Sequence, residues 1–544
     1  MDGAASEIFL IGCGPGGPQQ GTAEAMGFKA FNLARMAQAG VAVPAAFVLG
    51  TRYCREFFAR GAALDEPTRT AVQSCVRRLE AASGLGFGSQ RRPLLVSVRS
   101  GAPVSMPGMM ETVLDVGLCD TTLPGLLRLT GNPRLAWDSY RRLVQGFAEV
   151  VHGARAEPFA AAAGEELRQR AVERLDRLDF RGLRALATRF MEVYAEVVGE
   201  PFPQSPLDQL DGAVAAVFRS WRSEKAQAYR RTNGIPDALG TAVTVQQMVF
   251  GNSGGNSGAG VAFTRDPATG ENSLYLDFAF SAQGEDVVSG RTVLEHGQDL
   301  ARRLPGVYAE VLALKTRLEC VFHDAQELEF TVQDGRLFIL QTRSAKRTAL
   351  AALRIAVEQL DAGVLTPAEA QRNLAAIDVA GIEIVRVAGT GSATPLARGT
   401  AASIGVTSGR IALSPAGVVE LSRDGGPVLF LREDIATSDI VAIQAAAGIL
   451  TARGGRTSHA AVIARQLGKA CIVGCTDLRI DPGERSCSIA GHELHEGDPL
   501  CLDANTGAIF AGEPRITRVR PTALLARLAR HLGGCPRPGD ATAP

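Results

Sequence analysis

The spacing of apolar residues changes character along this chain. Between about residues 120 and 235, apolar side chains recur every three or four positions, most clearly in residues 137–151 and 183–198. This spacing gives each segment one apolar face and one polar face, which is typical of amphipathic helices. From residue 240 onward, short runs of β-branched and aromatic residues replace the pattern. We therefore expect a helical subdomain followed by a region rich in strands.

The strand-rich region is predicted to include one hairpin. Strands are expected at residues 7–11, 242–250, 260–264, 273–280, 328–332 and 337–342. Between the last two strands, residues 333–336 read Gln-Asp-Gly-Arg. An Asp-Gly pair in this position favours a two-residue turn in which both central residues have positive φ. The last two strands are therefore expected to pair with each other.

Two connecting helices and a second compact unit are expected after residue 345. Thr348 predicts the start of the first helix and Gly363 its end. Residues 366–369, Thr-Pro-Ala-Glu, form a capping-box pattern that predicts the start of the second helix. The compact unit is expected to contain two helices and strands at residues 409–413, 428–431, 448–451, 471–473 and 499–502. The Pro/Gly-rich end after about residue 530 predicts disorder.

Composition narrows the class of protein. The 544 residues suggest two to four domains. Lys plus Arg and Asp plus Glu number 57 each, so net charge gives no reason to expect a nucleic-acid or membrane-surface partner. No apolar run is long enough to span a bilayer, no signal-peptide pattern is present, and the ten cysteines are scattered. We therefore expect a cytoplasmic protein with reduced thiols.

The segment around His459 carries the clearest chemical signal. Two glycines at residues 454–455 follow a predicted strand and allow a tight turn. Thr457 or Ser458 is a suitable N-cap, so His459 is expected in the first turn of a helix that Gly468 ends. At that position the helix dipole disfavours an imidazolium, and unpaired backbone N–H groups suit a phosphoryl group. A histidine that attacks and then carries a phosphate would be favoured there.

Two carboxylates in one predicted strand suggest a metal site. Glu327 and Glu329 alternate with Leu328 and Phe330, so the two carboxylates share one face of the strand. Such a pair suits a Mg²⁺ ion that bridges nucleotide phosphates. The alternative is a solvated edge strand.

A glycine-rich segment, residues 251–260, lies between two predicted strands. Its N–H groups could fold over phosphates, or the segment could be a flexible hairpin. Lys29, Arg99 and Arg343 could neutralise phosphate charge, or each could serve in a surface salt bridge.

These stretches together resemble one known family. Residues 454–461, Gly-Gly-Arg-Thr-Ser-His-Ala-Ala, are similar to the Gly-Gly-x-Thr-Ser-His-Ala-Ala part of the phosphohistidine motif of the pyruvate phosphate dikinase and phosphoenolpyruvate synthase family. Further similar stretches are residues 96–102, 105–114, 241–254, 260–265, 282–288 and 340–343. The resemblance covers roughly residues 20–515 and favours the dikinase branch.

The resemblance implies an α/β and α+β multidomain fold. An ATP-grasp nucleotide-binding domain (residues 1–345, with the helical subdomain at about 120–235) would precede a helical connector or hinge (346–388). A swivelling β/β/α phosphohistidine domain (389–515) and a partly disordered C-terminal tail (516–544) would follow.

The resemblance also implies roles for individual residues. The implied catalytic residues are His459, Arg99 and Arg343. Nucleotide-binding residues would be Lys29, Arg99, Arg142, Gly254, Asn256, Ser257, Gly258, Gly260, Glu285, Gln341 and Arg343, with Glu327 and Glu329 as Mg²⁺ ligands. Thr457 is a candidate for regulatory phosphorylation, which plant members of the family show at this position.

The implied function is ATP-dependent phosphotransfer. His459 would form a phosphohistidine from the β-phosphate of ATP, with AMP and pyrophosphate released if inorganic phosphate is a co-substrate. Family members continue into a pyruvate-binding TIM barrel, and this sequence ends about where that barrel would start. A separate acceptor is therefore expected: a stand-alone barrel, a small molecule or a protein. A homodimer is the assembly that the family suggests.

Two other functions remain open at this point. One is a direct small-molecule kinase that uses the phosphohistidine, and the other is a non-catalytic ATP-binding regulatory protein. The second alternative is motivated by departures from the family pattern. They are Phe28 and Phe31 beside Lys29, Asn256 and Ala259 in place of threonines, Glu327 in place of Asp, and Arg456 in place of a Met.

Overall fold

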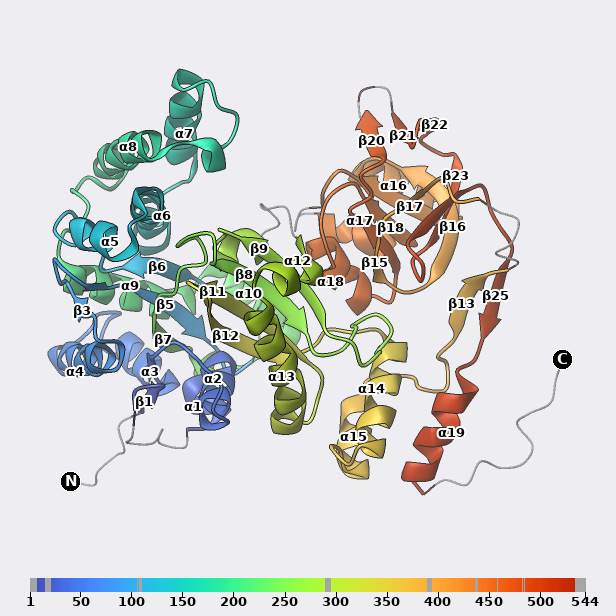
Figure 1. The fold of residues 1–544 in the computed structure, drawn as a ribbon, viewed down its shortest axis with the longest axis horizontal. Coiled ribbons are helices and arrows are strands. Elements are labelled where there is room, and N and C mark those ends of the chain that lie inside the picture. Colours follow the sequence, from blue (N-terminus) through green and yellow to red (C-terminus); the bar gives the residue numbers. More distant parts are fainter. Residues whose placement is uncertain are drawn as a thin grey trace. The chain divides into compact units, whose positions relative to one another are not determined.

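The chain folds as two compact units. The computed structural model describes residues 7–14, 21–104, 106, 110–288, 295–388, 394–435, 439–456, 458–481, 483 and 485–533 (Figure 1). One unit comprises Met1–Ser257 with Thr331–Thr342, and the other comprises Gly258–Phe330 with Arg343–Pro544. The predicted domain of residues 1–345 is thus divided between the two units.

The first unit is built on an antiparallel sheet of five strands. The sheet order is β1 (Ile8–Ile11), β2 (Ala46–Leu49), β7 (Ala242–Gln247), β5 (Val96–Gly101) and β6 (Thr112–Val116). The expected first strand is confirmed. Alongside the sheet lie α1 (Ala23–Met26), α2 (Phe28–Gln38), α3 (Thr51–Ala59) and α4 (Glu66–Ser83), with the short pair β3 (Gly86–Phe87) and β4 (Pro93–Leu94).

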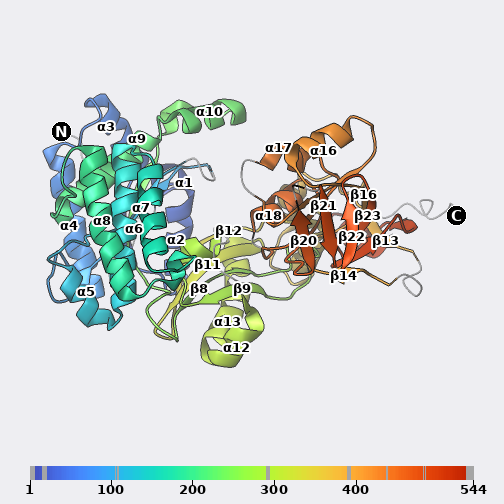
Figure 2. The same cartoon turned by 90° about the horizontal axis from the view of Figure 1, so that it is seen from above.

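The region of about residues 120–235, predicted as a helical subdomain, consists of helices in the structure. Its helices are α5 (Leu123–Thr130), α6 (Pro133–His152), α7 (Glu157–Gln169), α8 (Phe180–Val198), α9 (Pro206–Ser220) and α10 (Glu224–Asn233). Figure 2 shows α6 to α9 side by side. Aromatic rings fill the space between them: the ring centroid of Phe202 lies 5.7 Å from that of Phe147 and 5.3 Å from that of Tyr194.

A second sheet of five strands follows in the chain. Its order is β10 (Glu295–His296), β9 (Tyr275–Phe280), β8 (Gly258–Phe263), β11 (Gln326–Gln333) and β12 (Arg336–Ser344). The helices α11 (Gly284–Val288), α12 (Gly297–Arg303) and α13 (Pro305–Phe322) accompany it. The predicted hairpin is confirmed, because β11 and β12 are joined by Asp334 and Gly335, with φ values of 51° and 77°. Both values are positive, as this turn requires.

The glycine-rich segment is not the hairpin that its flanking strands suggested. β7 belongs to the first sheet and β8 to the second, so the segment connects two sheets. β8 also begins earlier than expected, at Gly258. A Cβ at Gly258 would lie 2.2 Å from the ring of Phe278, and one at Gly260 would lie 2.6 Å from the ring of Phe330. Glycine is therefore required at these two positions for the close packing of neighbouring strands.

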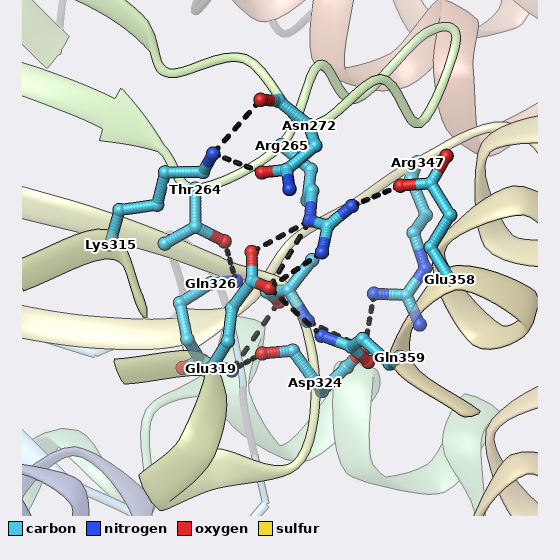
Figure 3. A network of polar contacts seen from close by, with 11 residues as sticks. Thr264, Arg265, Asn272, Lys315, Glu319, Asp324, Gln326, Arg347, Glu358 and Gln359 are labelled. Atoms are coloured by element: carbon cyan, nitrogen blue, oxygen red, sulfur yellow. Dashed lines mark hydrogen bonds and ion pairs between the residues drawn. The ribbon is translucent and has the colours of Figure 1, made fainter. Parts of the chain in front are cut away.

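A buried network of ion pairs and hydrogen bonds joins the connector to the second sheet (Figure 3). Arg265 follows β8 and donates from Nε and Nη2 to the carboxylate of Glu319 on α13, at 2.9 and 3.0 Å. Its Nη1 also donates to Glu358 on α14 (Ala349–Asp361). Gln359, the next residue of α14, donates to Glu319 at 3.2 Å. Because Arg265 and Glu319 are both buried, α13, α14 and the end of β8 are held as one piece.

The capping box predicted at Thr366 is confirmed. It starts α15 (Pro367–Leu374), with the Thr366 and Glu369 side chains each bonded to the other's backbone N–H. The pKa of Glu369 is lowered to about 2, chiefly by the hydrogen bond from the Thr366 N–H, and His323 Nδ1 lies 2.9 Å from its Oε1.

Glu369→Gln is expected to remove one pH-dependent contribution to stability. A carboxylate whose pKa is lowered in the folded state stabilises the fold fully above its unfolded value, near 4.5. That contribution is lost as the pH falls toward 2. The difference in urea midpoint between wild type and Glu369→Gln should therefore shrink steadily between pH 5 and about 2. A difference that does not change with pH over this range would contradict the assignment.

The predicted tail, residues 516–544, begins with one strand and one helix, and its residues 534–544 lie outside the described part. β25 (Ile516–Val519) pairs antiparallel with β13 (Ile384–Val387), and α19 (Thr522–His531) packs on α14. The pairing joins segments about 130 residues apart, so the hydrophobic pattern of either segment alone could not indicate it.

The remaining part of the second unit is a layered β/β/α domain. Its main sheet has the order β14 (Ala397–Arg398), β24 (Ala508–Ala511), β23 (Pro499–Asp503), β16 (Val406–Ala412), β17 (Val428–Arg432), β18 (Gly448–Thr451), β19 (Ala470–Val473) and β15 (Thr400–Ser403). One core cluster joins the sheet to α16 (Pro415–Ser422), α17 (Ile440–Ala445) and α18 (His459–Gln466). A second cluster joins it to the small sheet β20 (Leu478–Asp481), β21 (Ser486–Ile489) and β22 (His492–His495). The predicted layer architecture is confirmed. None of the helices in the described ranges is both long enough and apolar enough to cross a membrane.

Candidate phosphotransfer site

His459 is the first residue of α18. Ser458 is its N-cap, and the Ser458 hydroxyl accepts a hydrogen bond from the N–H of Ala461. The helix ends as predicted, because Gly468 adopts a left-handed conformation (φ 64°) and the next N–H bonds back to Ala464. The expected first-turn position of His459 is thus confirmed. The His459 side chain and all of Thr457 lie outside the described part of the chain.

Glu327, Glu329 and Arg343 come together on two adjacent strands. Arg343 Nη2 on β12 donates to Glu327 Oε1 on β11 at 2.5 Å. Burial alone would lower the pKa of Arg343, but the hydrogen bond to Glu327 and the charges of Glu327 and Glu329 outweigh it and raise the pKa. Glu327 is buried and Glu329 half-buried, so the alternative of a solvated edge strand is excluded for Glu327. The guanidinium remains charged and is fixed beside both carboxylates.

This donor set fits a magnesium ion that is shared with a nucleotide. Within the described ranges, no cluster of three or more His, Cys, Asp or Glu side chains could hold a metal alone. Mg²⁺ in nucleotide sites is commonly held by one or two carboxylates, with substrate phosphates and water completing the octahedron. Glu327 and Glu329 provide such a pair, with Arg343 beside them to meet phosphate charge.

Lys29 and Arg99 lie at a junction between α2 and β5. Lys29 is exposed in the first turn of α2, and Arg99 is half-buried on β5. The junction is tight, because a Cβ at Gly27 would lie 1.9 Å from the carbonyl oxygen of Gly101. The N–H of Phe28 also donates to the Ala102 carbonyl at 3.0 Å. Phe28, a departure from the family pattern, thus takes part in the backbone contact that joins the two segments.

Arg142 has a local partner that the sequence analysis missed. Its Nε donates to Asp138 Oδ2, one helical turn earlier on α6, at 2.8 Å. Arg141 donates to the same carboxylate at 2.7 Å. Burial would raise the pKa of Asp138, but the two arginines outweigh it and lower the pKa. The spacing of three and four residues is the available signal for this cluster.

The glycine-rich segment rests on the turn of the β11–β12 hairpin. Ser257 Oγ accepts from the N–H of Asp334 at 2.9 Å, and the Asn256 carbonyl accepts from the N–H of Gly335 at 2.9 Å. The N–H of Ser257 donates to the Gly254 carbonyl at 3.0 Å. Ser257 is fully buried, so its hydroxyl holds the segment in shape.

The predicted site residues fall in both units. Lys29, Arg99, Arg142, Gly254, Asn256, Ser257 and Gln341 belong to the first unit. Gly258, Gly260, Glu285, Glu327, Glu329, Arg343 and His459 belong to the second. Gln341 is half-buried on β12, and Glu285 lies in α11 with its side chain outside the described part.

The chain thus combines two five-stranded sheets with a β/β/α domain in which helix α18 begins at His459. Residues 63–296 match the family model "Pyruvate phosphate dikinase, AMP/ATP-binding domain", and residues 426–507 match "PEP-utilising enzyme, mobile domain". The chain belongs to the pyruvate phosphate dikinase family.

Relatives from distant organisms agree with this assignment. The pyruvate, phosphate dikinase of Clostridium symbiosum is 41% identical over 499 residues, which are 90% of this chain and 56% of that protein. Those of Rhizobium meliloti (strain 1021) and Zea mays (pyruvate, phosphate dikinase 2) are 39% and 38% identical, and in each case the match covers 94% of this chain and 58% of the relative. The chain thus spans little more than half the length of these relatives.

Proposed function

We propose that this protein forms a phosphohistidine at His459 from the β-phosphate of ATP and passes the phosphoryl group to a separate acceptor. The observation that carries the proposal is the position of His459 as the first residue of α18. Unpaired N–H groups at a helix start favour a bound phosphoryl group. The dipole there disfavours a protonated imidazole, which leaves a nitrogen lone pair available for attack.

The proposed reaction has two steps. In the first, an imidazole nitrogen forms a bond to the β-phosphorus, the bond from that phosphorus to the α-bridging oxygen breaks, and AMP leaves. In the second, an oxygen of inorganic phosphate forms a bond to the γ-phosphorus of the pyrophosphoryl group on the histidine, and the bond from that phosphorus to the β–γ bridging oxygen breaks. Pyrophosphate leaves, and a phosphohistidine remains.

The charged residues would act mainly by binding and orienting the phosphate groups of ATP. Lys29 and Arg99 would bind phosphate oxygens, and Arg343 would stabilise the charge that develops during transfer. Arg142, with Asp138, would lie further from the phosphates. Glu327 and Glu329 would hold Mg²⁺, which neutralises phosphate charge when bound.

The acceptor is proposed to lie outside the described residues. Their sheets form no parallel eight-stranded barrel, so a pyruvate site of that kind would belong to another chain or to residues outside this sequence. A small molecule or a protein would also serve as acceptor. A homodimer and a cytoplasmic location complete the proposal, and Thr457 is the proposed site of regulation.

Exchange between ATP and AMP tests the first step. Wild type incubated with Mg²⁺, ATP and radiolabelled AMP should move label into ATP, because the pyrophosphoryl transfer is reversible. His459→Ala should show no exchange above background. Exchange that survives this substitution would contradict the proposal. ATP binding without exchange in wild type would favour the regulatory alternative.

A further inference from the structure

Arg456 links the histidine loop to the second sheet. It lies three residues before His459, and its Nη1 donates to Asp266 Oδ2 at 3.0 Å. Its guanidinium carbon also lies 4.6 Å from the ring centroid of Tyr275, at the start of β9. The pair is shielded from solvent, since the Arg456 and Asp266 side chains are 22% and 14% exposed. Shielding makes an ion pair of this kind stronger than a surface pair.

Asp266 is held ready for this contact. Its Oδ1 accepts from the N–H groups of Ala268 and Thr269, at 2.7 and 2.9 Å, which leaves Oδ2 for Arg456. The same turn is fixed to the connector, because Thr348, the N-cap of α14, donates to the Ala268 carbonyl at 2.6 Å. The Asp266 carboxylate is therefore already oriented to accept a hydrogen bond from Arg456. This lowers the conformational entropy that is lost when the contact forms.

Tyr275 is fixed in the same way. Its hydroxyl donates to Asp277 Oδ1 at 2.8 Å. Burial is the main reason that the pKa of Tyr275 is raised, and the neighbouring Asp277 adds to the effect. The ring therefore stays neutral and presents its face to the guanidinium of Arg456.

The contact brings the histidine helix to the end of the sheet that carries Glu327. Thr264, which follows β8, is a hydrogen-bonded neighbour of Gln326, the first residue of β11, so Asp266 and Glu327 lie close to the same end of the sheet. Arg465, six residues after His459, has its guanidinium carbon 5.6 Å from the ring centroid of Phe263 on β8. α18 thus lies against the strands beside the proposed metal carboxylate.

We propose that Arg456 is a positioning residue that docks the His459 loop on Asp266 and Tyr275 for transfer from the nucleotide. This inference rests on the proposed function, and it assigns a role to a residue where the family pattern has methionine. Dissolved salt screens the attraction between the Arg456 and Asp266 charges, so the docked state should become less populated as salt is added.

The test is the single-turnover rate of phosphohistidine formation with Mg-ATP and inorganic phosphate. Arg456→Met should lower the rate about 10-fold with little change in the ATP concentration for half-maximal rate. Asp266→Asn should have a similar effect, because the amide oxygen can still hold the turn but the amide nitrogen cannot accept from Arg456. The double variant should be no slower than either single variant. Arg456→Lys should recover part of the rate, and the wild-type rate should fall with added salt.

Arg453→Met is the matched control, since Arg453 is on the same loop but 75% exposed, with Glu433 at 3.8 Å. A rate for Arg456→Met within twofold of wild type, or additive losses in the double variant, would overturn the inference. Hydrogen exchange without ATP provides a readout that does not depend on the proposed function. A peptide spanning residues 453–456 should exchange faster in Asp266→Asn than in wild type. Unchanged exchange would overturn the docking contact even if wild type forms no phosphohistidine.

Discussion

Arg265→Met is expected to lower the free energy of unfolding of the second unit by about 3–5 kcal/mol. The substitution leaves the buried Glu319 carboxylate without its guanidinium partner, and Glu358 loses its link to the sheet. An unpaired buried charge costs much more than the intact pair contributes. Urea unfolding, with hydrogen exchange of peptides from α13 and α14 as the local readout, measures the loss.

Two further variants separate this explanation from general damage. Arg265→Met combined with Glu319→Leu removes both buried charges and should recover much of the stability. Arg302→Met removes a surface ion pair between Arg302 and Asp299, in which the arginine side chain is 75% exposed. This variant should change the free energy of unfolding by no more than about 0.5 kcal/mol. A double variant as unstable as Arg265→Met would show that the buried charge is not the cause.

Arg343→Met is expected to slow phosphohistidine formation by about 100-fold or more in a single turnover. The substitution removes a charged donor that the proposed function aims at the transferred phosphoryl group. It also leaves the buried Glu327 without the hydrogen bond at 2.5 Å that orients it. Because the buried Glu327 loses its charged partner, the variant should also lose stability, and urea unfolding shows whether the rate is measured on folded protein.

Arg336→Met is the control for this effect. Arg336 is an exposed arginine at the opposite end of β12 and contacts the ring of Phe338. Its replacement should leave the rate unchanged. Arg343→Lys keeps the charge but not the planar fork, so its rate should lie between those of wild type and Arg343→Met. Equal rates for Arg343→Met and wild type would remove Arg343 from the proposed mechanism.

Local sequence signals predicted several turns and helix starts. The Asp334-Gly335 turn, the Thr366 capping box and the start of α18 each depend on a few adjacent residues, and all three were predictable for that reason. The layer architecture of the histidine domain followed from the same kind of signal together with the family resemblance.

Features that depend on distant residues were not predictable in the same way. Nothing near residues 251–260 indicates that β7 and β8 belong to different sheets, because sheet membership depends on partners elsewhere in the chain. Two other features also depend on residues far apart in the sequence. They are the pairing of β13 with β25 and the contact of Arg456 with Asp266, which is 190 residues away. Arg142 differs, because its partner Asp138 lies four residues earlier on the same helix, a spacing that the sequence shows.

The mass of the intact protein after incubation with Mg-ATP tests the central claim most directly. Wild type should gain one phosphoryl group when inorganic phosphate is present, and His459→Ala should gain none. The added phosphoryl group should be lost in acid and retained in base, because a phosphorus–nitrogen bond to histidine is labile in acid. No increase in wild type with or without inorganic phosphate, while ATP binding is intact, would contradict the account, as would an equal increase in His459→Ala.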